Sequence, residues 1–340
     1  MKDTGYDSEK ELINSDPLDQ SLHNIKVFSA EDIKKMISME EAIGLMEQAF
    51  ASFSCGKSHV PQRYISDFPG LPMDIFFKPV YCDDLGRIAA KILTQKRENS
   101  NMEKPTILGI VLLFDSTSGE LLSLIDGTYL TALRTGAASG IATRLLARKD
   151  ADTVAVFGCG AQGRTQLEAV CNVRPIKHAM LFDTSSSASA RLMEEMKKKL
   201  DISISIEEDM MSLKQADIIC TATSSQTPLF QIEDIRQGVH INAIGSFKPQ
   251  MQEIDPMIIK SSNLFVDSRK AVLNESGDLI KPIKEGVISE NNIRGEIGEL
   301  VNDTVPGRQG ANEITLFKSV GIAVQDLFVA NAVYNNSLNN

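Results

Sequence analysis

A glycine-rich loop, Gly158-Cys159-Gly160-Ala161-Gln162-Gly163, restricts the fold of this chain more than any other feature. It follows a short apolar run, Thr153–Phe157, and opens a segment with helical periodicity. In such a strand–turn–helix unit the first glycine permits the tight turn, the second lets the backbone approach a pyrophosphate, and the third lets helix and strand pack closely. The helix N-terminus adds free N–H groups and a positive dipole end. The loop therefore predicts a dinucleotide site on a Rossmann-type βαβ unit; the alternative is the same turn without a bound dinucleotide.

An acidic residue follows the next apolar run. This run, His178–Phe182, is followed by Asp183, which lies 20 residues after Gly163. A carboxylate at that place would accept hydrogen bonds from the adenosine ribose and would repel a 2′-phosphate. The first arginine after it is Arg191. We therefore predict NAD(H) as the cofactor, with NADP(H) as the alternative.

From residue 150 onward, short apolar runs alternate with segments of helical periodicity. The expected strands are 153–157, 178–182, 202–206, 217–221, 239–243 and 264–266, and the expected helices are 162–171 and 187–200. Such alternation is typical of a parallel, doubly wound sheet. Because ligands bind beyond the carboxyl ends of such strands, the loops at 221–225 and 245–246 should border the cofactor.

The first part of the chain has a different pattern. It is expected to begin with a flexible polar tail at 1–24, followed by a helix at 38–56 that starts with a capping box of Ser38 and Glu41. A β region at 60–126 comes next and contains a hairpin of 107–114 and 121–125. A second helix is expected at 129–147. The final segment, 316–334, is expected to be one more amphipathic helix. We therefore expect an α/β protein that combines a Rossmann doubly wound parallel sheet with an α+β domain.

The composition argues against several classes of protein. A net charge of −10 gives no basic field for nucleic acid or for an anionic membrane, so neither partner is predicted. The five cysteines have no C-x-x-C spacing, and we predict neither a disulfide framework nor a metal site. The first 24 residues lack an apolar signal core, and no run is long enough to cross a bilayer. A cytoplasmic location is expected.

Three basic residues, Arg63, Lys91 and Arg134, lie among apolar or small neighbours. Burying such a cation is costly unless it meets an anion. A guanidinium group suits a carboxylate, which it can bind through two parallel hydrogen bonds. These residues therefore indicate a pocket for a small carboxylate, and the alternative is that they pair internally or extend to solvent.

Several motifs together resemble the ornithine cyclodeaminase/μ-crystallin family. They are Pro61-Gln62-Arg63, the segment around Lys91, Asp126-Gly127, residues 130–139 (LTALRTGAAS), the glycine loop, residues 240–246 (HINAIGS) and residues 313–321 (EITLFKSVG). The resemblance covers nearly all of the chain after residue 25. It implies a homodimer of two-domain subunits. A substrate-binding and dimerisation domain would comprise 25–135 and 315–340, and a Rossmann NAD(P)-binding domain, 136–314, would be inserted between them.

The resemblance also implies roles for individual residues. Arg63 and Lys91 would hold a substrate carboxylate, with Arg134 near both it and the nicotinamide, and Lys91 and Arg134 would be catalytic. Phe247 and Val320 would contact the substrate. The residues expected around the cofactor are Thr106, Arg134, Gly158, Gly160, Ala161, Gln162, Gly163, Asp183, Thr223, Ser246 and Ser319.

One position departs from the family pattern. Ornithine cyclodeaminases have an aspartate two residues after the glycine of the Ile-Gly-Ser segment, where it serves as base and pairs with substrate amines; here the residue is Phe247. Phenylalanine cannot accept a proton. Glu253 is no sign of a replacement, because the family has an acidic residue there as well.

We therefore expect a ketimine reductase. It would reduce a small cyclic imino acid, Δ1-pyrroline-2-carboxylate or Δ1-piperideine-2-carboxylate, to L-proline or L-pipecolate. The alternatives are an ornithine cyclodeaminase, an alanine-type amino-acid dehydrogenase and a non-catalytic NAD(P)-dependent binding protein for a small ligand.

Overall fold

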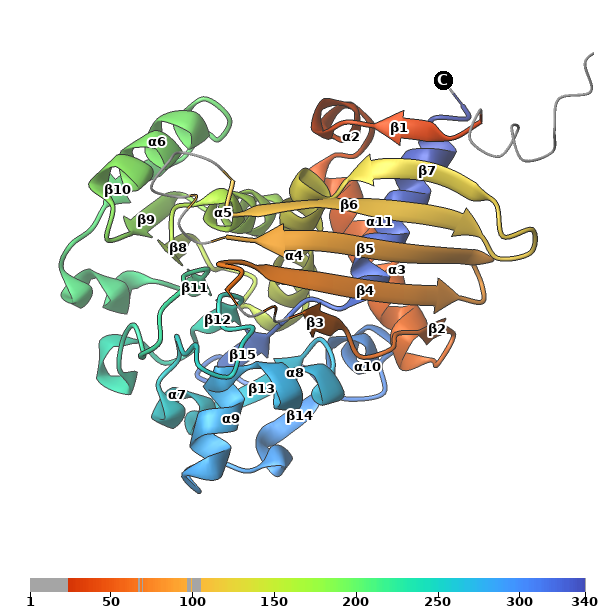
Figure 1. The fold of residues 1–340 in the computed structure, drawn as a ribbon. Coiled ribbons are helices and arrows are strands. Elements are labelled where there is room, and N and C mark those ends of the chain that lie inside the picture. The colour runs from red at the N-terminus through yellow and green to blue at the C-terminus, as the bar shows by residue number, and fades with distance from the viewer. Residues whose placement is uncertain (1–23, 67, 69, 97–98, 100–104, 340) are drawn as a thin grey trace, which may run out of the picture.

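The computed structural model describes residues 24–66, 68, 70–96, 99 and 105–339. Its strands form two sheets, one of seven strands and one of eight, which lie side by side in Figure 1. Apart from Asn24, the tail expected at 1–24 lies outside the described residues. Within the described part of the chain, no helix is both long enough and apolar enough to span a bilayer.

The first sheet is built from the N-terminal third of the chain. Its strands are β1 (Lys26–Phe28), β2 (Ser58–His59), β3 (Tyr64–Ser66), β4 (Asp74–Cys82), β5 (Arg87–Gln95), β6 (Ile107–Asp115) and β7 (Leu121–Asp126). Strands β4 to β7 form an antiparallel meander, which confirms the predicted hairpin, and β1 joins β7 in parallel.

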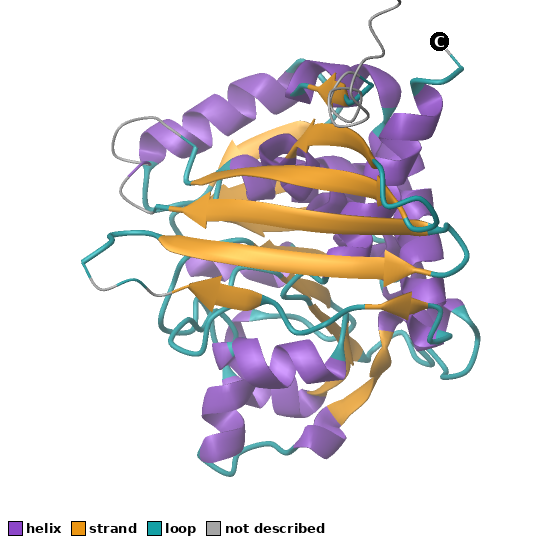
Figure 2. Ribbon diagram, turned by 45° about the vertical axis from the view of Figure 1, so that its right-hand side comes forward, coloured by secondary structure: helices purple, strands orange, loops and turns teal. Residues whose placement is uncertain are grey.

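Helices cover one face of this sheet. Helices α4 (Gly127–Leu146) and α11 (Ala323–Asn336) pack against its strands, and α3 (Met39–Ser54) packs on both helices, with the short α2 (Ala30–Met36) beside them. The predicted capping box is confirmed, because the Ser38 hydroxyl accepts from the Glu41 N–H and the Glu41 carboxylate accepts from the Ser38 N–H. In Figure 2 the helices lie behind the sheet, and none of those described crosses its front face.

The second sheet is parallel throughout. Its strands are β8 (Thr153–Phe157), β9 (His178–Phe182), β10 (Ser203–Ile206), β11 (Ile218–Thr221), β12 (His240–Ala243), β13 (Ser262–Val266), β14 (Ile293–Glu296) and β15 (Ile314–Lys318). Their order is β10-β9-β8-β11-β12-β15-β13-β14. The order reverses between β8 and β11, as in Rossmann-type sheets. The predicted doubly wound α/β fold is confirmed.

The connections of the second sheet are mostly helical. They include α5 (Ala161–Val173), α6 (Ser186–Lys197), α7 (Pro256–Ser261), α8 (Arg269–Glu275), α9 (Gly277–Lys284), α10 (Ile297–Val301) and the 3₁₀ turns η2 (Met210–Gln215), η3 (Ile232–Asp234) and η4 (Glu290–Asn292).

The prediction of a helix at 316–334 is wrong for the first third of that segment. Residues 314–318 form the central strand β15, and the helix begins only at Ala323. The two elements are separated at Gly321, whose φ of +77° is a conformation that helices do not contain. All five residues of β15 are buried, so the apolar run reflects a strand covered on both faces rather than one face of a helix. The expected domain boundary at 315 falls inside this strand, and the domain division itself stays a prediction.

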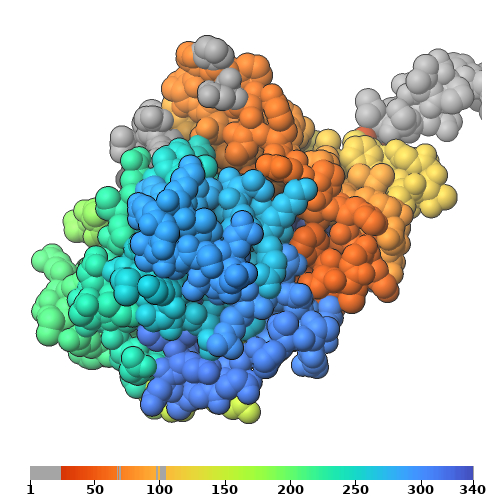
Figure 3. Space-filling view, turned by 90° about the horizontal axis from the view of Figure 1, so that it is seen from below, coloured from red at the N-terminus to blue at the C-terminus, as the bar shows by residue number. Residues whose placement is uncertain are grey.

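The two sheets share packed contacts through α4. This helix is buried along nearly its whole length, and its small residues let neighbouring backbones approach closely. A Cβ at Gly136 would lie 2.5 Å from the Thr165 carbonyl oxygen of α5. One apolar cluster joins side chains of the first sheet with Phe265 and Phe317 of the second. Figure 3 shows from below how the green-to-blue surface of the second sheet adjoins the orange surface of the first.

Candidate active site

A cavity of about 1020 Å³ lies between the two sheets. Residues that follow the carboxyl ends of β8, β9, β11, β12 and β15 form one side of it, and residues of β4, β5 and α4 form the other. The reversal of strand order between β8 and β11 lies at this edge, where ligands of doubly wound sheets bind. The cavity is therefore the candidate active site.

The glycine loop has the geometry of a dinucleotide cradle. Gly158 has a φ of +92°, and a Cβ there would lie 2.6 Å from the Ala222 carbonyl oxygen. A Cβ at Gly163 would clash with the Gly158 carbonyl, so this glycine lets α5 pack against the loop. Gly160 caps α5 without a side-chain hydrogen bond, and its Cα faces open space in the cavity. The first turn of α5 therefore keeps its N–H groups free for an anion such as a pyrophosphate.

Asp183 lies at one end of the cavity and braces the glycine loop. Its carboxylate accepts the Cys159 N–H at 2.6 Å and the Ser185 N–H at 2.8 Å. Glu207 and Glu208 line the same end, which makes it acidic. The sequence interpretation missed these two residues, although they directly follow β10 and the strand-end argument applied to Asp183 would have found them.

The loops after β11 and β12 are held by Glu253. Its fully buried carboxylate accepts hydrogen bonds from the N–H and hydroxyl of Thr223, the hydroxyl of Thr221 and the N–H of Gly245, at 2.6 to 2.8 Å. Burial raises the pKa of this carboxyl. Each carboxylate oxygen already accepts two of these hydrogen bonds, so Glu253 positions the cavity wall and is not placed to act as a base.

At the opposite end of the cavity, Arg63 bridges the two sheets. Its guanidinium group pairs with Glu275 at 2.6 Å and donates to the carbonyl oxygens of Phe247 at 2.9 Å and Val320 at 3.3 Å. Its charge also lies over the Phe76 ring, 5.4 Å from the ring centre. These contacts fix the guanidinium at the cavity wall.

Lys91 and Arg134 share one buried acid, Asp326 of α11. The Asp326 Oδ1 accepts the Lys91 amine at 2.6 Å and the Arg134 Nε at 3.1 Å. Burial alone would raise the pKa of Asp326, but the two cations hold it below its usual range. Burial lowers the pKa of Lys91 to about 7. The sequence interpretation missed Asp326, yet a charged residue among the apolar residues of the last helix meets the criterion that singled out the cations.

The cavity brings most of the predicted site residues together. Those lining it are Arg63, Thr106, Arg134, Gly158, Gly160, Gln162, Asp183, Thr223, Phe247, Ser319 and Val320. Among the described residues, Lys91, Ala161, Gly163 and Ser246 are not part of the lining. Lys91 is 1% exposed behind the wall, and the Ser246 hydroxyl is buried against the Met251 carbonyl oxygen.

The loop after β15 completes the wall. The Asp267 carboxylate accepts the Ser319 hydroxyl and the N–H groups of Val320 and Gly321, at 2.7 to 3.0 Å. Gly321 leaves room for the Arg134 guanidinium, which a Cβ at this position would strike. The loop therefore places Ser319 and Val320 against the cationic end of the cavity.

The second sheet and its glycine loop define a Rossmann-type protein with an added seven-stranded sheet. The chain belongs to the ornithine cyclodeaminase/mu-crystallin family, whose model matches residues 24–340, and the resemblance seen in the sequence is confirmed. It is 37% identical over 314 residues to a Delta(1)-pyrroline-2-carboxylate reductase of Bacillus cereus, covering 92% of this chain and 96% of the relative.

Two solved structures have the same fold. One is the Delta(1)-pyrroline-2-carboxylate reductase of Thermococcus litoralis in complex with NADH and L-proline, with a TM-score of 0.90 and 41% identity over 92% of this chain and 97% of that chain. The other is an archaeal alanine dehydrogenase dimer with bound NAD, with a TM-score of 0.87 and 32% identity over 93% of this chain and 96% of that one.

Proposed function

We propose that this protein is an NADH-dependent ketimine reductase that converts Δ1-pyrroline-2-carboxylate to L-proline. One observation carries the proposal: a single cavity has a glycine cradle at one end and the guanidinium groups of Arg63 and Arg134 at the other. The reductases of Bacillus cereus and Thermococcus litoralis are the relatives that support this choice of substrate. Δ1-Piperideine-2-carboxylate, one methylene larger, is the second imine to consider.

The residues of the cavity fit a nicotinamide dinucleotide. The open N-terminus of α5 suits the pyrophosphate, and Asp183, which lines the cavity, would accept the ribose hydroxyls. Asp183, Glu207 and Glu208 would repel a 2′-phosphate, which favours NADH over NADPH. Thr106, Thr223 and Ser319 also line the cavity and would flank the nicotinamide. When bound, the cofactor supplies the hydride for the imine carbon.

The cationic end would hold the substrate carboxylate. The Arg134 Nε and Nη1 bond Asp326 and Gln325, while Nη2 has no hydrogen-bond partner among the described residues. Arg63 lines the same wall, so a carboxylate between the two guanidinium groups would be oriented from both sides. Lys91, which lies behind the cavity wall, would act indirectly. It shares Asp326 with Arg134 and would help to fix the Asp326 and Arg134 side chains. Phe247 and Val320 would contact the ring.

The test is NADH oxidation by the purified protein with Δ1-pyrroline-2-carboxylate, screened beside Δ1-piperideine-2-carboxylate, L-ornithine, and pyruvate with ammonia. We expect turnover with the cyclic imines and no need for ammonia. A protein that oxidises NADH with none of the imines would refute the proposal.

Two other reactions are separated by the same screen. Ornithine cyclodeamination would release ammonia with catalytic NAD, and Phe247, where cyclodeaminases have an aspartate, argues against it. An alanine dehydrogenase would oxidise NADH only with pyruvate and ammonia together. The screen contains this pair because the chain is 32% identical to the archaeal alanine dehydrogenase. Binding of NADH without any turnover would identify a carrier.

We also propose a homodimer in the cytoplasm. The uncovered face of the first sheet carries exposed apolar side chains, among them Phe77, Ile88, Leu108 and Ile110. Such a face suits contact with a second copy, and the archaeal relative is a dimer. The five cysteines are unpaired, which suits a reducing compartment.

A further inference from the structure

A fourth basic residue, Lys78, lies at the cationic end of the cavity. It is 5% exposed, sits on the inner face of β4 directly opposite Lys91 of β5, and lines the cavity with Arg63 and Arg134. Its amine donates to the Gly321 carbonyl oxygen at 3.1 Å. None of the ion pairs among the described residues involves Lys78, whereas Arg63, Lys91 and Arg134 each have an acid.

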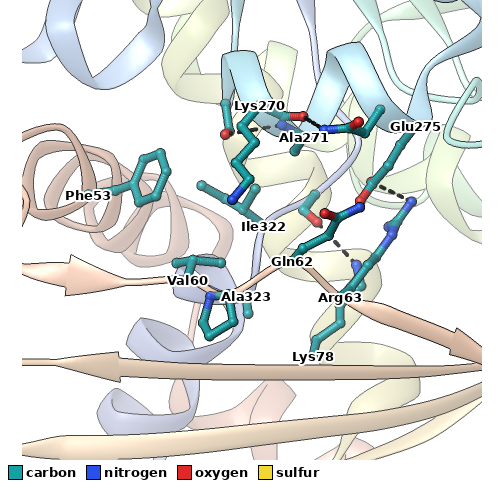
Figure 4. Close-up of a pocket in the computed structure, with 14 residues that line it drawn as sticks. Phe53, Val60, Gln62, Arg63, Lys78, Lys270, Ala271, Glu275, Ile322 and Ala323 are labelled. Carbon is teal, nitrogen blue, oxygen red and sulfur yellow. Dashed lines mark hydrogen bonds and ion pairs between the residues drawn. The ribbon is translucent and has the colours of Figure 1, made fainter.

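A second, smaller cavity reaches the same side chain. It has a volume of about 50 Å³, which is room for at least one water molecule, and it is lined by Lys78, Arg63, Glu275 and Gly321 on its inner side. Its outer side is formed by residues exposed to solvent, among them Gln62 and Lys270. In Figure 4 the Lys78 side chain rises from β4 beside Arg63, below this small cavity. Lys78 therefore separates a solvent-facing chamber from the proposed substrate cavity.

The charges around Lys78 favour its uncharged form while the substrate cavity holds no anion. The titratable and charged groups that surround it are Arg63, Lys91, Arg134, Lys270, Glu275 and Asp326. Burial, followed by the charges of Arg63, Lys91 and Arg134, places the pKa of Lys78 well below its usual value, against the opposing pull of Asp326. A carboxylate entering beside Arg63 and Arg134 would add a negative charge to this group and increase the proton affinity of the amine.

We propose that Lys78 is the proton-exchanging residue of this site. Its amine takes up a proton through the small chamber when a substrate carboxylate enters the large cavity, and it passes that proton to the substrate nitrogen. This inference rests on the proposed reductase function and assigns the proton donor for that reaction.

The proton balance is complete. The Lys78 ammonium gives one proton to the imine nitrogen, which becomes an iminium, and Lys78 returns to the neutral amine. Hydride addition to the imine carbon then yields the neutral secondary amine, and the product takes its second proton from solvent on release. Lys78 is recharged from water through the chamber.

Proton uptake on binding tests the first half of the proposal without turnover. Pyrrole-2-carboxylate, a flat ring carboxylate that NADH does not reduce, is titrated calorimetrically into the NADH complex at pH 7.5 in buffers of different ionisation enthalpy. We expect net proton uptake in the wild type and in Lys270→Met, which removes a cation at the chamber's outer side. We expect clearly smaller uptake in Lys78→Met and in Lys78→Arg, which keeps a permanent charge, because Lys91 remains able to take up a proton there and Lys78 does not. Equal uptake in the wild type and Lys78→Met would overturn the proposal.

Turnover of two substrates tests the second half. With Δ1-pyrroline-2-carboxylate, kcat should fall by about 10²–10⁴-fold in Lys78→Met and Lys78→Arg, the range for loss of a general acid. With the N-methylated pyrrolinium carboxylate, whose iminium charge is fixed, Lys78→Met should work at a rate near that of the wild type. An equal loss on both substrates would show that Lys78 has only a structural role. A wild-type protein that reduces neither substrate would refute the reductase function itself. The calorimetric experiment would still test whether Lys78 takes up a proton, because it needs no turnover.

Discussion

At the scale of single residues, Phe247 shapes both the chemistry and the charge of the site. Phe247 lines the cavity, and its carbonyl oxygen accepts a hydrogen bond from Arg63. An apolar ring there adds no charge, so the basic residues of this wall, Arg63, Arg134 and Lys78, would be the charged groups that face a small carboxylate. The side chain would therefore favour a ligand with one anionic group and an uncharged ring over a diamine.

Replacing Phe247 with aspartate should weaken binding of the imine. The new carboxylate would lie beside Arg63 and compete with the substrate for its charge, so we expect KM for Δ1-pyrroline-2-carboxylate to rise about tenfold or more. Phe247→Asn, which is polar but uncharged, is the matched control and should raise KM much less. Steady-state NADH oxidation measures both variants, and equal KM values for them would contradict the electrostatic explanation.

Asp183 should set both the affinity for the cofactor and its selectivity. Removal of its carboxylate in Asp183→Ser deletes the proposed ribose contacts and the brace on the Cys159 N–H, a loss of about 1.5–3 kcal/mol for hydrogen bonds to a charged group. We expect the KM for NADH to rise at least tenfold and that for NADPH to change less. Glu208→Gln, at the same end of the cavity, is the comparison and should change the KM for NADH little. Unchanged discrimination between NADH and NADPH in Asp183→Ser would refute the assignment.

At the scale of elements, local sequence rules located most of the second sheet. Strands β8 and β9 have the expected bounds, because a buried parallel strand is a short apolar run that ends at a turn residue. The same rule explains the failure at β15, whose apolar run merged with that of α11 because the intervening loop, residues 319–322, is itself buried. The pairing of Asp326 and Glu275 with cations was missed because ion pairs 192 to 235 residues apart leave no local pattern, although the apolar neighbours of Asp326 could have singled out that residue by itself.

The close packing of α4 on α5 can be tested with a pair of glycines. In Gly136→Ala the new methyl group would meet the Thr165 backbone, and we expect a loss of about 1–3 kcal/mol in the free energy of unfolding. Gly44, inside α3, has open space around its Cα, so Gly44→Ala should instead stabilise the protein by about 0.5–1 kcal/mol through helix propensity. Urea unfolding measures both variants. Stabilisation by Gly136→Ala would show that the helices can move apart without cost.

At the scale of the whole molecule, the two faces of the first sheet differ in their surroundings. One face lies under α4 and α11, and the other carries Phe77, Leu108 and Ile110 with more than a third of their surface exposed. Phe77 lies opposite Ile92, and Ile92 lies opposite Ile110, so these side chains form a continuous apolar stripe across three strands. Covering such an apolar stripe with a partner removes it from water and stabilises the assembly.

A charge in this stripe should separate the proposed dimer. For wild-type protein we expect a sedimenting mass near twice the 37.2 kDa of one chain, and for Ile110→Lys a mass near that of one chain. Met211→Lys, at a side chain 63% exposed on η2, is the control and should stay dimeric. A wild type that sediments as one chain at micromolar concentration would refute the dimer.

The position of Asp326 on α11 has a consequence for biosynthesis. A ribosome releases residues in order, and Lys91 and Arg134 emerge some 200 residues before the acid that they share. Until α11 has left the exit tunnel, Lys91 and Arg134 of the nascent chain therefore lack the carboxylate that they share. At that stage β15 is also missing from the interior of the second sheet. The candidate active site is thus completed only late in translation, when α11 delivers Asp326.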